Sequence, residues 1–123
     1  LHEFLRRWWQ QYGGTPAAGL TKLMVSEAAN FPDLARYYQD EVIDPSHELL
    51  RRVVQRGIDS GEFRAVDVPT LLHIVIAPLV QMVTWRYSMA PCSPSAHQIE
   101  PMQLIRLHAD LMVRGLRREA PSP

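Results

Sequence analysis

The sequence of 123 residues contains a single cysteine, Cys92, and this scarcity excludes two kinds of framework. An intrachain disulfide needs two cysteines, and a cysteine-based zinc cluster also needs more than one. The lone thiol fits a reducing compartment. Because Cys92 lies in a segment rich in proline and serine, we expect it to be exposed, with redox sensing as the alternative role.

The sequence also lacks an excess of charge of either sign, with 13 basic and 13 acidic residues. Domains that bind nucleic acid usually carry a basic stripe, because neutralised phosphates supply most of their non-specific affinity. Here the arginines form short clusters that acidic neighbours offset, such as Arg51 and Arg52 beside Glu48. We therefore expect solvated helix faces, and no DNA binding by this chain alone.

Long apolar runs and an N-terminal signal-peptide pattern are missing as well. The longest apolar run, residues 71–85, is interrupted by His73, Pro78 and Gln81. A membrane span needs about 20 apolar residues. We expect no membrane contact and a cytoplasmic location.

No catalytic or metal-binding motif occurs in the chain. The sequence has no His-Glu-x-x-His pair, no glycine-rich phosphate loop and no cysteine–histidine motif, and its five histidines are scattered. We predict that the protein is not an enzyme and uses no cofactor and no metal. A metal site built from His73 and His108 is the alternative.

Helical periodicity is what the sequence does contain, and it predicts an all-α fold of five helices without strands. Thr15 and Asp67 are expected to cap helices at their N-termini, and Gly61 is expected to end one. Pro45 predicts a kink or break. We expect one domain over residues 1–118 and a flexible tail over residues 119–123. The predicted helices span residues 1–12, 16–31, 32–60, 68–87 and 101–118.

The fourth predicted helix, residues 68–87, is apolar on almost every side. A helix on the surface of a monomer needs only one apolar stripe. This helix must therefore run through the centre of the domain, or a second chain must cover it. Pro78 cannot donate to the carbonyl of Ile74, so it could kink this helix and open room for a ligand; the alternative is a neutral accident of packing.

Several short patterns occur in a fixed order along the chain. Residues 27–34 give Glu-x-x-x-Phe-Pro-x-Leu, and residues 57–64 give Gly-Ile-x-x-Gly-Glu-Phe-Arg. Asp67 then opens the apolar helix, and Gly-Leu at 115–116 closes the last one. Together they resemble the ligand-binding and dimerisation part of the tetracycline-repressor-like (TetR/AcrR) transcriptional regulators, over roughly residues 1–116.

The resemblance implies a homodimer in which the last two helices of each subunit form a four-helix bundle. It also implies a pocket, enclosed by the earlier helices, for a small effector that is mostly apolar or aromatic. Effector binding would alter DNA binding by a helix-turn-helix domain, which is absent from this chain and is expected before Leu1. The alternative is a helical homodimerisation or interaction module with no small-molecule site.

Large, polarisable side chains are the candidates for lining the pocket, because flat rings and flexible methionines accept varied apolar ligands. The same residues at helical spacing also suit a core. His73 would orient the ligand, or be a buried imidazole bonded to a backbone carbonyl. Glu27 is expected to bond to the N-terminal amides of the next helix. The candidate ligand-binding residues are Trp8, Tyr12, Met24, Tyr38, His73, Met82 and Trp85.

The candidates for the dimer interface lie on the fourth and last predicted helices. Gly115 is included because a small residue lets two helices approach closely. The alternative is that the last helix packs only against its own subunit. The candidate interface residues are Leu79, Val83, Leu104, His108, Leu111 and Gly115.

Overall fold

The computed structural model describes residues 1–92 and 98–118, and every regular element in these ranges is helical. The predicted all-α fold is therefore confirmed, while the predicted tail at 119–123 lies outside the described residues. Short turns of 3₁₀ or π type accompany the α-helices: η1 (Trp9–Gly13), η2 (Pro16–Ala18), η3 (Gln39–Ile43) and η4 (Ala90–Cys92). The α-helices are α1 (His2–Trp8), α2 (Gly19–Glu27), α3 (Pro32–Tyr38), α4 (Asp44–Asp59), α5 (Val68–Arg86) and α6 (Pro101–Leu116).

The long third predicted helix is built from α3, the π-turn η3 and α4 in direct succession. Pro45 lies in the first turn of α4, immediately after η3. A π-turn shifts the helical hydrogen-bond register by one residue, and here it precedes a residue that has no N–H to donate. The break expected at Pro45 therefore takes the form of a π-turn before the proline.

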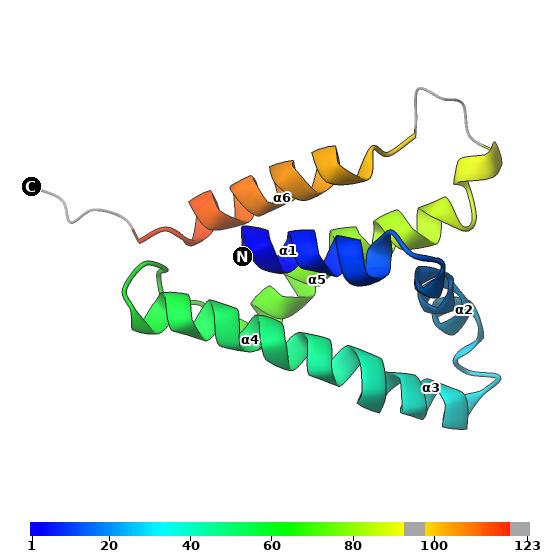
Figure 1. Ribbon diagram of the computed structural model, residues 1–123. Coiled ribbons are helices and arrows are strands. Elements are labelled where there is room, and N and C mark those ends of the chain that lie inside the picture. Colours follow the sequence, from blue (N-terminus) through cyan, green and yellow to red (C-terminus); the bar gives the residue numbers. More distant parts are fainter. Residues whose placement is uncertain (93–97, 119–123) are drawn as a thin grey trace, which may run out of the picture.

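Helix α5 passes between α4 and α6 and behind α1 (Figure 1). One side of it is covered, while Ile74 on the other side is half exposed. The helix continues through Pro78 to Arg86. The prediction of a central helix is thus confirmed for one side of α5 only. Its buried side chains are Leu71, Leu72, Val75, Leu79, Met82 and Val83.

By length and composition, α5 is the one helix in the described ranges that could cross a membrane. Its 19 residues exceed the apolar run on which the sequence-based exclusion relied, so that argument from length was too strict. Core helices share this length and composition, and six side chains of α5 are buried within the chain.

The turn that follows α4 is fixed against the end of α6. The Phe63 ring lies over Gly57, where an added Cβ would clash with the ring, and the Phe63 amide donates to the Gly57 carbonyl at 2.9 Å. Gly61 has the expected left-handed conformation, with φ of 79°. The Arg64 amide donates to the Leu116 carbonyl at 2.8 Å. The Gly-x-x-x-Gly-Glu-Phe pattern is therefore structural: it holds the turn after α4 against the C-terminal end of α6, two segments that lie far apart in the sequence (Figure 1).

Helix capping follows the sequence prediction at one position and departs from it at another. The Asp67 carboxylate accepts from the Thr70 amide at 3.2 Å, as predicted. Thr15 precedes η2 without a side-chain capping bond, and its hydroxyl donates to the Tyr12 carbonyl at 2.7 Å instead. Glu100, which the sequence analysis missed, caps α6 by accepting from two amides of its first turn.

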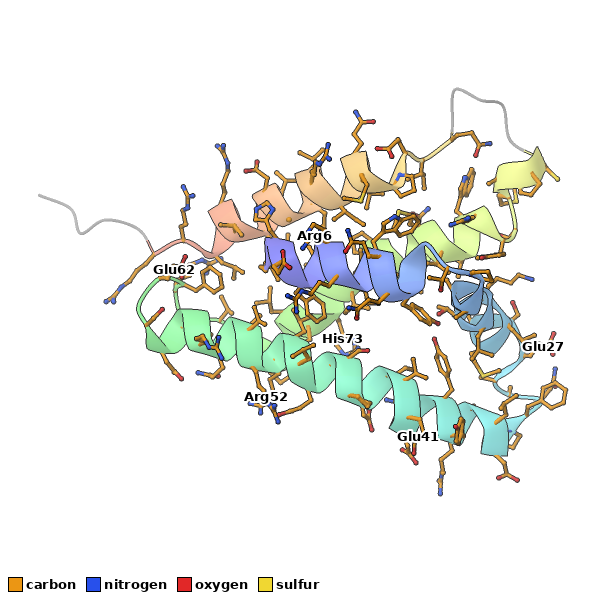
Figure 2. The ribbon with its side chains drawn as sticks, in the orientation of Figure 1. Arg6, Glu27, Glu41, Arg52, Glu62 and His73 are labelled. Atoms are coloured by element: carbon orange, nitrogen blue, oxygen red, sulfur yellow. The ribbon has the colours of Figure 1, made fainter. Side chains whose placement is uncertain are left out.

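The arginine clusters lie on solvated faces, as predicted. On α4, the Glu48 carboxylate binds Arg51 at 2.7 Å and Arg52 at 3.3 Å, and all three side chains are substantially exposed. Arg52 points away from the bundle (Figure 2). Exposed ion pairs of this kind add little stability.

Candidate ligand-binding site

A cavity of about 380 Å³ lies among α1, α2, α3, α4 and α5, with both π-turns on its wall. Ligand pockets in proteins usually measure about 300–1,000 Å³. The wall is mostly apolar, and it contains no Asp, Glu, Lys or Arg among the described residues. Its aliphatic side chains include Val25, Ala28, Ala35, Val42, Ile76 and Val80.

The two π-turns supply four of the residues on the cavity wall. Tyr12 comes from η1, and Gln39, Val42 and Ile43 come from η3. An inserted residue turns a different set of side chains inward than an uninterrupted α-helix would, and such π-turns are frequent at functional sites. A regular period of 3.6 residues carries no sign of this insertion, so the sequence analysis missed it.

Three hydroxyl groups from three elements meet at the cavity wall, and we call Tyr12, Thr21 and Tyr38 the hydroxyl trio. The Tyr38 hydroxyl lies 2.9 Å from that of Tyr12 and 2.7 Å from that of Thr21. The Tyr12 and Thr21 hydroxyls are also hydrogen-bonded to each other. Thr21 and Tyr38 are each 7% exposed. The trio therefore satisfies polar groups that burial would otherwise leave unpaired.

Burial raises the pKa of the Tyr38 phenol above its ordinary value. The hydrogen bond with Thr21 acts in the opposite direction on that pKa but is the smaller influence. The Tyr38 phenol is consequently uncharged at neutral pH. Since an unpaired charge is costly in an apolar environment, the site suits an uncharged molecule.

A model of the tetracyclin repressor-like C-terminal domain family matches residues 1–94 of the chain. The chain belongs to this family. It is thus a domain of a transcription regulator, as the resemblance implied. The match covers α1 to α5 and every residue of the cavity wall, whereas α6 begins beyond it. No curated protein and no solved structure matches the chain.

Four of the seven predicted ligand-binding residues line the cavity of this TetR-like domain. They come from α1, η1, α2 and α3, and they lie together because these elements pack around one space. Thr21 was missed, because a single threonine in an apolar helix gives no signal in the sequence. The four residues are Trp8, Tyr12, Met24 and Tyr38.

Met82 and Trp85 lie away from this cavity. The α5 residues on the cavity wall are Ile76 and Val80, whereas Met82 and Trp85 border a second hollow of about 360 Å³ beside Trp9 and the start of α6. The Trp85 Nε1 is buried and has no hydrogen-bond partner among residues 1–92 and 98–118. The sequence shows that α5 is apolar all round, but not which of its faces each neighbour covers.

His73 is exposed on α5, on the side facing α4 (Figure 2), and is not on the cavity wall. Its ring lies edge-on to that of His47, with the ring centres 6.0 Å apart. His47 itself lines the cavity. The arrangement expected as an alternative for His73, a buried imidazole bonded to a carbonyl, occurs instead at His108, whose Nε2 lies 2.7 Å from the Val75 carbonyl oxygen.

The predicted interface residues divide between the core and the outer surface of the domain. Leu79 and Val83 are fully buried within the chain, and His108 is also buried. Leu111 is 55% exposed, Leu104 is half-buried, and Gly115 has open space around it. Leu107, which the sequence analysis missed, is 59% exposed. The outer face of α6 thus carries Leu104, Leu107, Leu111 and Gly115 at helical spacing.

Two other polar predictions have clear outcomes. The Glu27 carboxylate accepts from the Asn30 side chain at 2.7 Å, so the expected bond to the amides of α3 was wrong; the turn between α2 and α3 supplies a nearer donor. Cys92 is exposed, as predicted.

Within the described ranges, no group of three or more His, Cys, Asp or Glu side chains is arranged to hold a metal ion.

Proposed function

We propose that this domain senses a small, mostly apolar or aromatic effector, which binds in the cavity and alters DNA binding by the regulator. The observation that carries the proposal is the cavity of about 380 Å³, whose wall is apolar and free of full charges among the described residues. A ligand shifts a conformational equilibrium only as far as its affinities for the two states differ. The proposal includes a cytoplasmic location and does not include a catalytic role.

We further propose that the domain forms a homodimer through the outer face of α5 and α6. Leu107 and Leu111 on α6 are more than half exposed, and Ile74 on α5 is 50% exposed. Ile74 and Gly115 line one groove between the two helices. A stable interface buries about 1,200–2,000 Å² in total, which this stripe supplies only as part of a wider contact.

A pair of leucines with equal exposure tests the dimer. Leu111 and Leu49 are each 55% exposed, the first on α6 and the second on α4. Leu111→Glu is expected to convert the dimer to monomer in sedimentation equilibrium, while Leu49→Glu leaves it intact. Equal mass for both variants and the wild type would contradict this interface.

A pair of alanines tests the cavity. Ala35 lines it, whereas Ala29 is exposed and does not. Ala35→Phe places a ring in the cavity and is expected to abolish calorimetric binding of naphthalene-based probes, while Ala29→Phe retains it. Equal binding by both variants would place the ligand elsewhere.

The alternative is a homodimerisation module without a small-molecule site, for which the apolar stripe on α6 is sufficient. The two proposals agree on the dimer and differ on the cavity. A dimer that binds none of the apolar probes, with a melting temperature that no probe changes, would support the alternative.

A further inference from the structure

The hydroxyl trio can accept a hydrogen bond from a ligand but has no free hydrogen to donate to one. Each hydroxyl carries one hydrogen and can accept as well as donate. The trio makes three mutual contacts, one between each pair of oxygens. Because three contacts use all three hydrogens, the closed ring has no hydrogen left for a ligand. It retains the ability to accept.

The other polar groups on the wall lie further along the same helical run as Tyr38. Gln39, Ser46 and His47 follow it on η3 and α4. His47 is nine residues beyond Tyr38, which corresponds to about 13 Å along a helix axis. Gln39 directly follows Tyr38, and its side-chain amide donates to the Asp44 carboxylate at 2.6 Å. The trio and Gln39 are therefore the polar groups at one end of the lining, and an elongated ligand meets the trio without also reaching His47.

Charged ligands find no fixed partner on this wall. No Asp, Glu, Lys or Arg lines the cavity among the described residues. A carboxylate at the trio would face three acceptors and no free donor, and burying such an unpaired charge is costly. A carbonyl or ether would need one ring contact to open before it could receive a hydrogen.

We infer that the effector of this domain is an uncharged, mostly apolar molecule that donates a hydrogen bond to the hydroxyl trio, such as a phenol, an alcohol or an N–H compound. The inference rests on the proposed function, effector binding in this cavity. It adds which polar group the effector carries and where that group lies.

Removing one hydroxyl changes the preference in a predictable direction. Thr21→Val removes the hydroxyl and nearly preserves the shape of the side chain, so that Tyr12 and Tyr38 keep one contact and two hydrogens. One hydrogen is then free to bind an acceptor. Tyr38→Phe leaves the corresponding pair of Tyr12 and Thr21. Both variants should therefore accept ethers better than the wild type does.

The experiment is a calorimetric titration at neutral pH with β-naphthol, its methyl ether and β-naphthoate. The wild type is expected to bind the naphthol about ten-fold more tightly than the ether, the effect of one net hydrogen bond. It should not bind the carboxylate measurably. In Thr21→Val the preference for the naphthol over its methyl ether should fall to about two-fold. Circular dichroism confirms folding, and if Tyr38→Phe does not fold, Thr21→Val still decides.

The outcomes separate this inference from the proposed function. If the wild type binds the ether or the carboxylate as tightly as the naphthol, the inference is overturned and the cavity remains a ligand site. An unchanged ratio in Thr21→Val also overturns it. If none of the three probes binds, the proposed function fails, and the inference fails with it.

Discussion

The two halves of the helical run from α3 to α4 are packed in opposite ways. In the second half, Leu50 and Val54 are fully buried, and Phe63 covers Gly57 closely. In the first half, Val42 and Ile43 are only half-buried and border the cavity. We call these the closed end, residues 50–63, and the cavity end, residues 35–47.

The difference between the two ends comes from their neighbours rather than from the helical run itself. The closed end receives the turn after α4, which is hydrogen-bonded to the end of α6 (Figure 1). The cavity end faces the hydroxyl trio and the small side chains Ala28 and Ala35, which leave space unfilled. One apolar helix face thus supports core packing at one end and borders the cavity at the other.

The largest contrast should come from one substitution made at both ends. Val54 is fully buried, whereas Val42 borders the cavity. Val54→Ala is expected to lower the free energy of unfolding by about 2–3 kcal/mol, because it opens a void in packed core. Val42→Ala should cost less than about 1 kcal/mol, because its side chain already borders empty space. Urea unfolding measures both, and equal losses would remove the distinction between the two ends.

A second pair of variants tests how tightly the closed end is packed. Gly57 and Gly115 both lie in helices, but an added Cβ meets Phe63 at the first and nothing within 4 Å at the second. Gly57→Ala should destabilise by about 1.5 kcal/mol, since overpacking outweighs the gain in helix propensity. Gly115→Ala should stabilise by up to about 1 kcal/mol. A stabilised Gly57→Ala in urea unfolding would contradict the packing of Phe63.

At the cavity end, the adjacent residues Tyr38 and Tyr37 sharpen the comparison. Tyr38 is 7% exposed and Tyr37 is 65% exposed. Tyr38→Phe should lower the free energy of unfolding by about 1 kcal/mol by breaking the trio, and Tyr37→Phe should leave it nearly unchanged.

The same pair predicts a dependence on alkaline pH. The pKa of Tyr38 is raised from 10.0 on folding, so above pH 10 the unfolded chain loses this proton first and stability falls. The stability that the buried Tyr38 phenol contributes is fully present below pH 10. Unfolding series from pH 9 to 11 should show a shallower fall in Tyr38→Phe than in Tyr37→Phe. The same slope in both variants would contradict the burial of the phenol.

The smallest effect is expected at the exposed pair on α4. The pair is Glu48 and Arg51. The hydrogen bond from Arg51 to the Glu48 carboxylate is the main cause that lowers the pKa of Glu48 from 4.5 to about 2. The stability from this shift is present above pH 4.5 and is lost as the pH falls toward 2. Glu48→Gln should flatten this acid dependence slightly in thermal unfolding, while Glu41→Gln controls for the change in net charge. Identical acid profiles for the two variants would contradict the ion pair.

The sequence predicted those parts of the fold that depend on local chemistry. Helical periodicity gave the helical units, and Asp67 and Gly61 act at helix ends as predicted. The π-turns were missed, because the 3.6-residue period used to predict the helices carries no sign of an inserted residue. Glu100 as a cap was missed although it directly precedes Pro101.

The candidate site was predictable only where large side chains signalled it. Trp8 and Tyr38 were identified from their size, but Thr21 joins them through contacts between helices that lie apart in the sequence. Leu79 shows a second limit of prediction from the sequence, because it was predicted to lie at the dimer interface and is buried within the chain. A fully apolar helix does not reveal which of its faces its own chain buries, and Leu79 lies on a buried one.

The most direct test of the account is a crystal structure of the chain grown with β-naphthol. We predict electron density for the probe in the cavity beside Ala35 and Val42, with its hydroxyl within hydrogen-bonding distance of Thr21 or Tyr38. Density at another site, or a cavity that its own side chains fill, would contradict the claim that this space holds the effector.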